Sequence, residues 1–284
     1  MIILLESHYR TLLIITSEAA GRPMHIRIIQ WNIRINSDTG AILELLRSEV
    51  RTPTIVHLQE VSEFAFSMLH THLQPTGSAF SLEYRRPGKN EGRNRRMGVA
   101  TLAFGAAIVK SDLVKRSVFP ERTLVAEVEV GGTFVRTLNF HSLTGVDYKK
   151  AKSSNFASLA DFLESESIDF LCCDANEPKV DSLNWAEVEF FNNRDKGRCA
   201  AMIFGESPQH ALFDSFKVHL QNIGEGIEGS PLAVSHVVTG RYPRRYDHIF
   251  HSPQWEVEAM SYDYESAKKA TSDHAVVVAD FSYV

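Results

Sequence analysis

The chain has 284 residues, of which 44% are hydrophobic and 23% are charged, and its formal net charge is −5 at pH 7. The composition is that of an ordinary globular protein, and the acidic balance excludes a basic field over the whole molecule, so a nucleic-acid partner would have to be bound by a local patch. Only three cysteines are present and two of them are adjacent, which disfavours a disulfide framework and predicts a reducing, cytoplasmic compartment.

Residues 1–23 come before the first clear strand. They contain the apolar run Leu12-Leu13-Ile14-Ile15, but charged residues on both sides of it argue against a signal peptide. No segment of the sequence reaches the roughly 20 apolar residues of a transmembrane helix. We therefore expect an N-terminal extension of uncertain role at residues 1–23, followed by one domain at residues 24–284.

The first part of this domain alternates strands and helices. β-Branched runs predict strands, and i, i+3, i+4 apolar stripes predict amphipathic helices. By these rules we expect strands at 25–32 and 54–58, and helices at 40–50 and 62–73. The second helix is predicted to turn Phe64, Met68 and Leu69 toward the core.

The rest of the chain contains a hairpin signal and further strands. Gly131-Gly132 supplies the positive φ angles of a tight turn between alternating strands at 124–130 and 134–140. The remaining expected elements are a polar loop at 85–96, one or two strands within 98–109, helices at 147–163 and 184–191, strands at 168–173, 245–251, 256–261 and 275–281, and an irregular segment at 193–240. Strand pairs alternate with helices in both halves, which predicts an α/β (α+β) domain of two sheets packed face to face with helices outside.

Carboxylates and amides follow two of the apolar runs. Glu60 ends a buried strand, where a charge is costly unless it is paired or binds a cation. Carboxylate oxygens hold the hard cations that neutralise charge during phosphoester hydrolysis, so Glu60 is a candidate metal ligand. Asp174 and Asn176 leave another buried strand, and their spacing points both to one side if the chain stays extended. Asp174 could then orient a water as general base while Asn176 holds a phosphate oxygen.

The histidines supply a second set of candidates. An imidazole that acts in its charged form needs a carboxylate to fix its tautomer and raise its pKa, and Asp247 is the candidate partner of His274. Asp273 would lean toward a metal or its waters. His141 ends a strand and could either protonate a leaving group or bind a phosphate oxygen. Asn32 could bind phosphate or a metal-bound water.

Each of these residues also has an ordinary structural explanation. The alternatives are a solvent-facing glutamate, an Asx turn, turn chemistry before an apolar strand, a rim histidine and a capping asparagine. For all of them to hold, several strand ends would have to carry matched groups without purpose. The ordered set therefore favours the catalytic interpretation.

Two basic clusters are candidates for substrate binding. One lies in the loop 85–96 and includes Arg95 and Arg96, and the other includes Arg244 and Arg245. If they flank the site, these arginines could grip a phosphate backbone or an anionic headgroup, and solvated loops are the alternative. The loop 85–96 contains no aromatic residue on which a single-stranded base could stack.

The order of these motifs resembles that of the endonuclease/exonuclease/phosphatase superfamily, over about residues 24–284. The resemblance rests on six segments: Trp31-Asn32-Ile33, Leu58-Gln59-Glu60-Val61, Phe140-His141-Ser142, Asp174-Ala175-Asn176, Tyr246-Asp247-His248-Ile249-Phe250 and Ser272-Asp273-His274. It implies a four-layered α/β sandwich of two mostly antiparallel sheets flanked by helices. It also implies a Mg²⁺ cofactor, with Mn²⁺ as the alternative.

On the metal side, the resemblance implies that Glu60 is the metal ligand and that Asn32 and Asp273 are accessory metal or water-shell groups. The chain departs from the family in four respects: the Thr-Trp often seen before the Asp247 strand is not obvious, the Trp-Cys-Asp-Arg pattern of inositol 5-phosphatases is missing, and two single positions differ. Arg34 stands where some members have a metal-contacting acid, which puts a second metal-side ligand in doubt. Cys173 stands where the family commonly has glycine before the Asp-x-Asn motif.

On the catalytic side, the resemblance implies that Asp174 and Asn176 are the water-activating and phosphate-binding pair. Asp247 and His274 resemble the carboxylate–imidazole pair, and His141 resembles the second catalytic histidine. The implied reaction is in-line attack of water on phosphorus without a covalent enzyme intermediate.

We therefore expect a Mg²⁺-dependent phosphoester hydrolase, with a phosphodiesterase or nuclease acting on nucleic acid as the favoured form. A phosphatase or phospholipase-type enzyme acting on a small phosphate ester or lipid headgroup is the alternative, which the net charge of −5 keeps open. A non-catalytic binding module on the same fold is a third hypothesis, against which the complete residue set argues. No protein partner is inferred.

Overall fold

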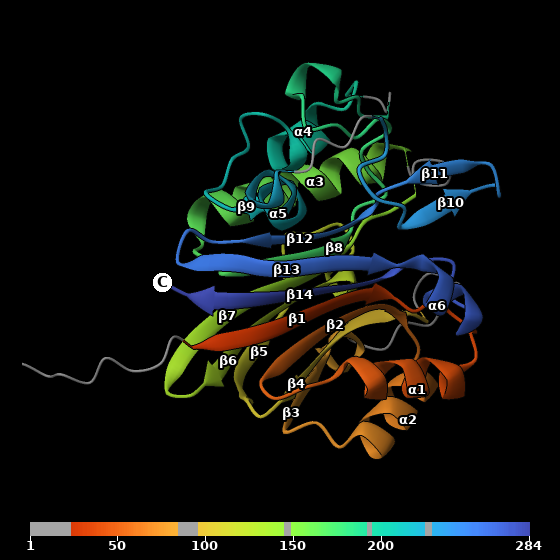
Figure 1. Cartoon of the computed structure of the whole chain (residues 1–284), viewed down its shortest axis with the longest axis vertical. Helices are drawn as coiled ribbons and strands as arrows, with labels where there is room; N and C mark the ends of the chain where they lie inside the picture. Colours follow the sequence, from red (N-terminus) through yellow and green to blue (C-terminus); the bar gives the residue numbers. More distant parts are fainter. Residues whose placement is uncertain (1–23, 85–95, 145–148, 192–194, 225–228) are drawn as a thin grey trace, which may run out of the picture.

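The computed structural model describes residues 24–84, 96–144, 149–191, 195–224 and 229–284, which form two six-stranded sheets and a separate hairpin (Figure 1). The first sheet has the strand order β13-β14-β1-β2-β4-β3 and contains both the first and the last strand. Its members are β1 (His25–Asn32), β2 (Thr54–Val61), β3 (Gly77–Phe80), β4 (Gly98–Phe104), β13 (Trp255–Asp263) and β14 (Val276–Tyr283).

The second sheet has the order β5-β6-β7-β8-β12-β9. Its members are β5 (Ala107–Asp112), β6 (Thr123–Val130), β7 (Thr133–His141), β8 (Phe170–Asp174), β9 (Phe213–Asp214) and β12 (Asp247–His251). Most neighbours are antiparallel, but β1 pairs with β2 and β7 pairs with β8 in parallel. The hairpin of β10 (His236–Val238) and β11 (Tyr242–Arg244) projects at the right of Figure 1.

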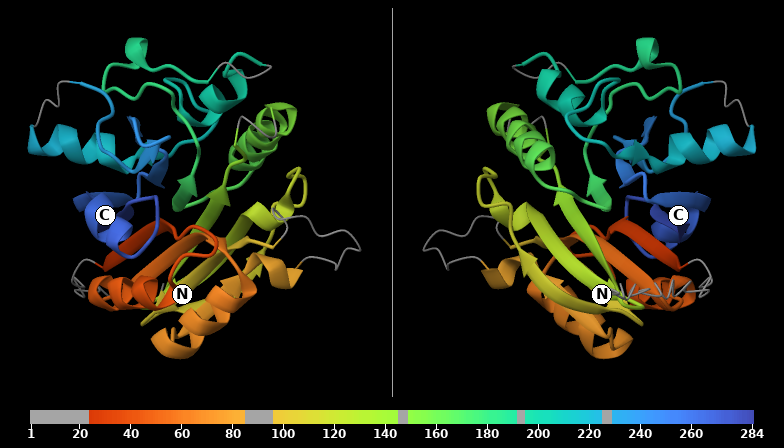
Figure 2. Two further views of the ribbon diagram at one scale, coloured as in Figure 1. Left: turned by 90° about the vertical axis from the view of Figure 1, so that its right-hand side faces the viewer. Right: turned by 90° about the vertical axis from the view of Figure 1, so that its left-hand side faces the viewer.

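Helices cover the outer faces of the two sheets, as Figure 2 shows. The first sheet carries α1 (Thr39–Glu49), α2 (Glu63–Leu73) and α6 (Tyr264–Lys269), and the second carries α3 (Lys149–Ser165) and α4 (Arg198–Phe204). The remaining helix, α5 (Ser215–Ile223), packs against β13 of the first sheet and β12 of the second, and its Phe216 and Leu220 join the core between the sheets. Single 3₁₀ turns occur at Ser81–Tyr84, Pro120–Arg122 and Trp185–Glu187. The predicted four-layered sandwich is thus confirmed.

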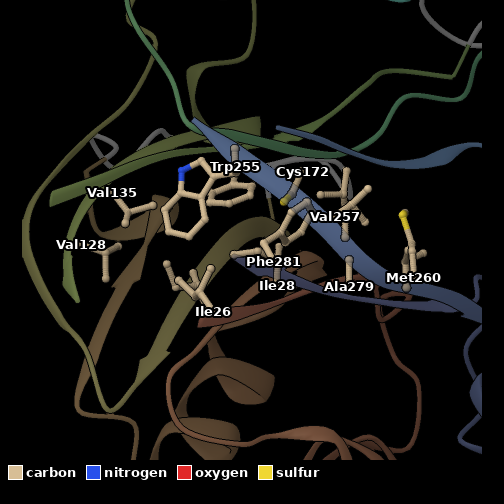
Figure 3. Packing of buried hydrophobic residues seen from close by; sticks show 14 of the residues in the cluster. Ile26, Ile28, Val128, Val135, Cys172, Trp255, Val257, Met260, Ala279 and Phe281 are labelled. Atoms are coloured by element: carbon tan, nitrogen blue, oxygen red, sulfur yellow. The ribbon is translucent and has the colours of Figure 1, made fainter. Parts of the chain in front are cut away.

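The core between the sheets is apolar at one end and polar at the other. Side chains alternate along a strand, so Ile26 and Ile28 of β1 face the same interior as Phe281 of β14 (Figure 3). Phe170 of the second sheet packs in the same cluster. The two phenylalanine rings are 4.9 Å apart, and fully burying a side chain of this kind contributes roughly 1.5–3 kcal/mol. The next inward position on β1 is the buried Gln30, and the one after it is Asn32. The interior therefore becomes polar toward the rim where these strands end.

The predicted strands, the glycine hairpin and the first three helices are confirmed within one to three residues at most ends. The inward face of α2 is partly wrong, because Ala65 and Leu69 are buried while Phe64 is 69% exposed. The helix expected at 184–191 is only a 3₁₀ turn, and the segment 193–240, expected to be irregular, contains α4, β9, α5 and β10.

Two predictions concern segments outside the described residues: the extension at 1–23 and the loop at 85–96 apart from Arg96. None of the described helices is both long enough and apolar enough to cross a membrane. All three cysteines are free, with Cys172 and Cys173 buried in β8.

Candidate active site

The candidate site lies at the rim where strands of both sheets end, at the right of Figure 1 below the β10–β11 hairpin. Each sheet has one parallel pair, and the carboxyl ends of these strands deliver four of the predicted residues, Asn32, Glu60, His141 and Asp174. Because β12 is antiparallel to β8, it starts at the same rim, and Asp247 lies opposite Asp174 in register.

Asp247 and His274 form a tightly held pair. Asp247 is fully buried and lies 2.7 Å from Nδ1 of His274, and it accepts a second hydrogen bond from Nε2 of Gln30 at 2.6 Å. Burial acts to lower the pKa of His274, but the carboxylates of Asp247 and Asp174 outweigh it and raise this pKa to about 10. The ring is therefore an imidazolium at neutral pH, with its Nε2 3.8 Å from Asp174.

Asp174 is the centre of the polar cluster. Its carboxylate accepts hydrogen bonds from Nδ2 of Asn32 at 2.9 Å and from the backbone N–H of Asn176 at 3.0 Å, and Nε2 of His141 lies 3.5 Å away. Burial raises the pKa of Asp174, although the charge of His274 opposes the shift. The chain does not stay extended here, because Asn176 has a φ of +50° and its amide turns back to 3.4 Å from Asp174.

A buried ion pair supports this turn from behind. Nζ of Lys152, on α3, donates to the backbone oxygen of Asn176 and to the carboxylate of Glu177, each at 2.8 Å. Both side chains are almost fully buried, so losing either partner would leave an uncompensated charge. The helical layer outside the second sheet thus fixes the position of Asn176.

His141 joins the two halves of the site. Its Nε2 lies 3.7 Å from Glu60, and the guanidinium of Arg122 lies 3.1 Å from its Nδ1 and 3.4 Å from its Nε2. Burial, helped by the charges of Arg122 and His274, lowers the pKa of His141 well below its ordinary value. A neutral imidazole can donate a hydrogen bond to a phosphate oxygen but has no extra proton for a leaving group, which favours the phosphate-binding role.

Glu60 and Asp273 line the open side of the site. Glu60 has a φ of +56° at an irregularity in β2, and its Oε2 accepts the backbone N–H of Ile35 at 3.0 Å. A polar pocket of about 570 Å³ is lined by both carboxylates together with His274 and Arg34. The Arg34 guanidinium lies 3.9 Å from Asp273.

The oxygen donors in this pocket fit a hard divalent cation such as Mg²⁺. Among the described residues, two trios have ligand atoms within 4.8 Å of one another, Asp174–Asp247–His274 and His236–Asp273–His274. Both contain the charged His274, and the first trio is buried and already hydrogen-bonded internally. An imidazolium is no metal ligand, so the carboxylates of Glu60 and Asp273 are the better candidates.

The arginines predicted to bind substrate differ in how far they are exposed. Arg245 is buried, with its guanidinium 2.6 Å from Asp181 and 2.7 Å from Asp214, so its expected phosphate-binding role is corrected to a structural one. Arg244 is half-buried on β11, and Arg96 is exposed. Arg95 lies outside the described residues.

Four residues that contact the site were not among the predicted site residues: Gln30, Arg34, Arg122 and His236. A signal existed for Gln30, because it precedes Asn32 by two positions and shares its face of β1. For Arg122 and His236, which lie far from the motifs in sequence, only the folded structure reveals the contact.

No family model matches the chain, and the comparison with curated proteins found no match. Solved structures do match it. The human Nocturnin catalytic domain with a bound sulfate anion has a TM-score of 0.64 at 18% identity, covering 92% of this chain and 95% of that one. TDP2 from D. rerio, complexed with single-strand DNA product, has a TM-score of 0.63 at 15% identity, covering 90% and 98%.

A third structure is an endonuclease/exonuclease/phosphatase from Bacteroides vulgatus, with a TM-score of 0.61 at 14% identity, covering 92% of this chain and 100% of that one. At such identities a likeness shows the fold alone. The chain has the fold of the endonuclease/exonuclease/phosphatase superfamily, as the order of its motifs predicts.

Proposed function

We propose that this chain, with its endonuclease/exonuclease/phosphatase fold, is a Mg²⁺-dependent phosphoester hydrolase, and that its preferred substrate is a phosphodiester of nucleic acid. The observation that carries the proposal is a continuous series of contacts across both sheets. It runs through Glu60, His141, Asp174, His274 and Asp247, and consecutive members are between 2.7 and 3.8 Å apart.

In the proposed reaction, Asp174 orients a water molecule and takes up its proton. A carboxyl group whose pKa is raised is the better base, so the burial of Asp174 suits this role. The water oxygen bonds to phosphorus as the P–O bond on the opposite side breaks, and the leaving oxygen keeps the electron pair and takes a proton from solvent. No covalent bond to the enzyme forms.

Donors around Asp174 stabilise the charge that develops on the phosphate oxygens. These donors are the His274 imidazolium, the Nε2–H of neutral His141 and the side-chain amide of Asn176. All three are held by contacts that exist before substrate binds, so little reorganisation is needed. A divalent cation bound at Glu60 and Asp273, when present, would supply further neutralisation of the phosphate and leaving oxygens.

The test is hydrolysis by purified protein that has been treated with a chelator and then supplied with Mg²⁺ or Mn²⁺. The substrates are plasmid, single-stranded oligonucleotide, sphingomyelin vesicles, inositol phosphates and bis(4-nitrophenyl) phosphate. We expect metal-dependent cleavage of the oligonucleotide, with one oxygen of ¹⁸O-labelled water entering each new phosphate end. Absence of hydrolysis of every substrate with either ion would reject the proposal.

A phosphatase or phospholipase-type reaction on a small ester or lipid headgroup is the second candidate. The buried position of Arg245 favours it, because this removes one of the four arginines expected to bind a nucleic-acid backbone. The D. rerio TDP2 structure with single-strand DNA product supports the first candidate. Cleavage of lipid or inositol phosphate alone would decide for the second.

A further inference from the structure

His236 contacts both the His274 ring and the backbone of Asp273, although it belongs to none of the six motif segments. It begins β10 and is half-buried. Its ring stacks on that of His274, with centroids 4.4 Å apart and planes inclined by 26°. Its Nδ1 lies 2.8 Å from the backbone oxygen of Asp273, and because a carbonyl oxygen can only accept, Nδ1 carries the proton.

The backbone around His236 is tied to the same two segments that carry the Asp247–His274 pair. The hydroxyl of Ser235 accepts the backbone N–H groups of Tyr246 at 2.8 Å and Asp247 at 3.1 Å. The backbone oxygen of Ser235 accepts the N–H of Ala275 at 2.7 Å, and His236 forms an isolated antiparallel bridge with His274. The place of the His236 ring is therefore set by main-chain contacts.

The stacked ring supplies a restraint that the Asp247 hydrogen bond does not. The hydrogen bond from Asp247 restrains Nδ1 of His274 in the plane of its ring but does not stop the ring from tilting. The His236 ring packs on the face of the His274 ring and opposes that tilt. The His236 ring is itself backed by Tyr246, at 5.8 Å and 22°. Catalytic groups need placement within about 0.5 Å, and a misplacement of about 1 Å can cost about 100-fold in rate.

We propose that His236 is a positioning residue for the reaction proposed above, on which this inference rests. Its ring face sets the tilt of His274, and its Nδ1–H fixes the backbone of Asp273 beside the metal pocket. One side chain thereby couples the orientation of the imidazole to that of the metal-side carboxylate.

Three substitutions separate the two contacts. His236→Phe keeps the stacked ring and removes the donor, His236→Asn keeps a donor near the position of Nδ1 and removes the ring, and His236→Ala removes both. His72→Ala is the matched control, because His72 is an exposed histidine at the end of α2. The probe is bis(4-nitrophenyl) phosphate with Mg²⁺, followed by a single-stranded oligonucleotide.

We expect His236→Ala to lower kcat about 10- to 100-fold, the loss typical for an outer partner of a catalytic group. Because the contact is to the catalytic ring and not to substrate, KM should change less than about threefold. His236→Phe should recover most of kcat but need more Mg²⁺ for half-maximal rate. His236→Asn should keep the Mg²⁺ requirement and lose kcat.

A spectroscopic measurement without substrate tests the same geometry. The ring protons of His274 should lose their ring-current shift in the Ala and Asn variants and retain it in the Phe variant. Wild-type kcat and unchanged His274 signals in His236→Ala would overturn the proposal. Equal losses in all three variants that track thermal stability would overturn it too, since that pattern indicates packing alone. If the wild type hydrolyses nothing, the proposed function fails, and the His274 signals still show whether the two rings interact.

Discussion

The imidazole side and the proposed metal side of the candidate site are built in opposite ways. Asp247 is fully buried and His274 nearly so, and the Asp247 carboxylate is held by hydrogen bonds from His274 and Gln30. On the metal side, the side chain of Glu60 is 22% exposed, that of Asp273 44% and that of Arg34 55%. The groups that the proposed reaction requires to be charged and oriented in advance are enclosed, and the proposed metal ligands are left open to exchange water for an ion.

Solvation explains the difference. Burying an unpaired carboxylate is expensive, so a residue that awaits an ion keeps its water, whereas the Asp247 carboxylate is compensated by His274 and Gln30. Preorganised donors are also most effective where water is excluded. Substitutions on the two sides should therefore produce different kinds of defect.

The largest effect is expected at the enclosed centre. Asp174→Ala and His274→Ala should each lower kcat about 1,000-fold or more, because both groups act mainly in the transition state of the proposed reaction. Thermal melting should show that both variants still fold. His72→Ala serves as the control, and near wild-type activity in both variants would reject the assigned roles.

Asp247→Asn should produce a smaller loss with a distinctive pH dependence. In the proposed reaction His274 acts in its charged form, which persists up to its pKa of about 10, so the alkaline fall in wild-type activity should begin only near that pH. Without the Asp247 carboxylate, burial lowers this pKa, and the fall should move toward neutral or acid pH. We expect a loss of about 10- to 100-fold at pH 8 that shrinks as the pH is lowered. A pH–rate profile whose alkaline limb does not move would contradict the pairing.

Glu60→Gln should affect the metal requirement instead. The Mg²⁺ concentration for half-maximal activity should rise about 10- to 100-fold, while the alkaline limb of the pH profile stays in place. The measurement is a Mg²⁺ titration of the initial rate at fixed pH. If Glu60→Gln and Asp247→Asn gave the same defect, the division of the site into two sides would be wrong.

The smallest effect is expected for Arg34→Ala. The exposed ion pair with Asp273 contributes about 0–1 kcal/mol, so freeing the carboxylate should lower the Mg²⁺ requirement by at most about fivefold. Arg34→Lys keeps the charge and is the matched control. If Arg34→Lys needed less Mg²⁺ for half-maximal activity than Arg34→Ala, the charge of Arg34 would not compete with the ion for Asp273.

Much of the fold and the site could be predicted because β-strands have a period of two. Along β1, the inward series Ile26, Ile28, Gln30 and Asn32 passes from core to rim, and the motif lies where the apolar pattern ends. The same rule holds on β8, where Cys172 faces the core between the sheets and Asp174, two positions later, is on the same face at the end of the strand. Local pattern therefore locates the strand ends, and with them most of the motif residues.

What could not be predicted depends on contacts distant in sequence. In the sequence, Arg245 resembles a surface arginine next to Arg244, but Asp181 and Asp214 contact it only after folding.

The helix α5 did have a local signal, since Asp214 caps it and Phe216 and Leu220 form a stripe. Its short length within a glycine-rich stretch masked that signal. On α2, Phe64 lies one position away from the buried pair Ala65 and Leu69, which turns it to solvent.

The order of strands has a consequence for biosynthesis. The chain begins the first sheet, completes the second, and returns to pair β14 beside β1, and His274 is placed only by that last step. A nascent polypeptide on the ribosome thus holds Asn32, Glu60 and Asp174 long before it can hold the reaction centre. The proposed reaction therefore requires β14, and a chain truncated before this strand should be inactive.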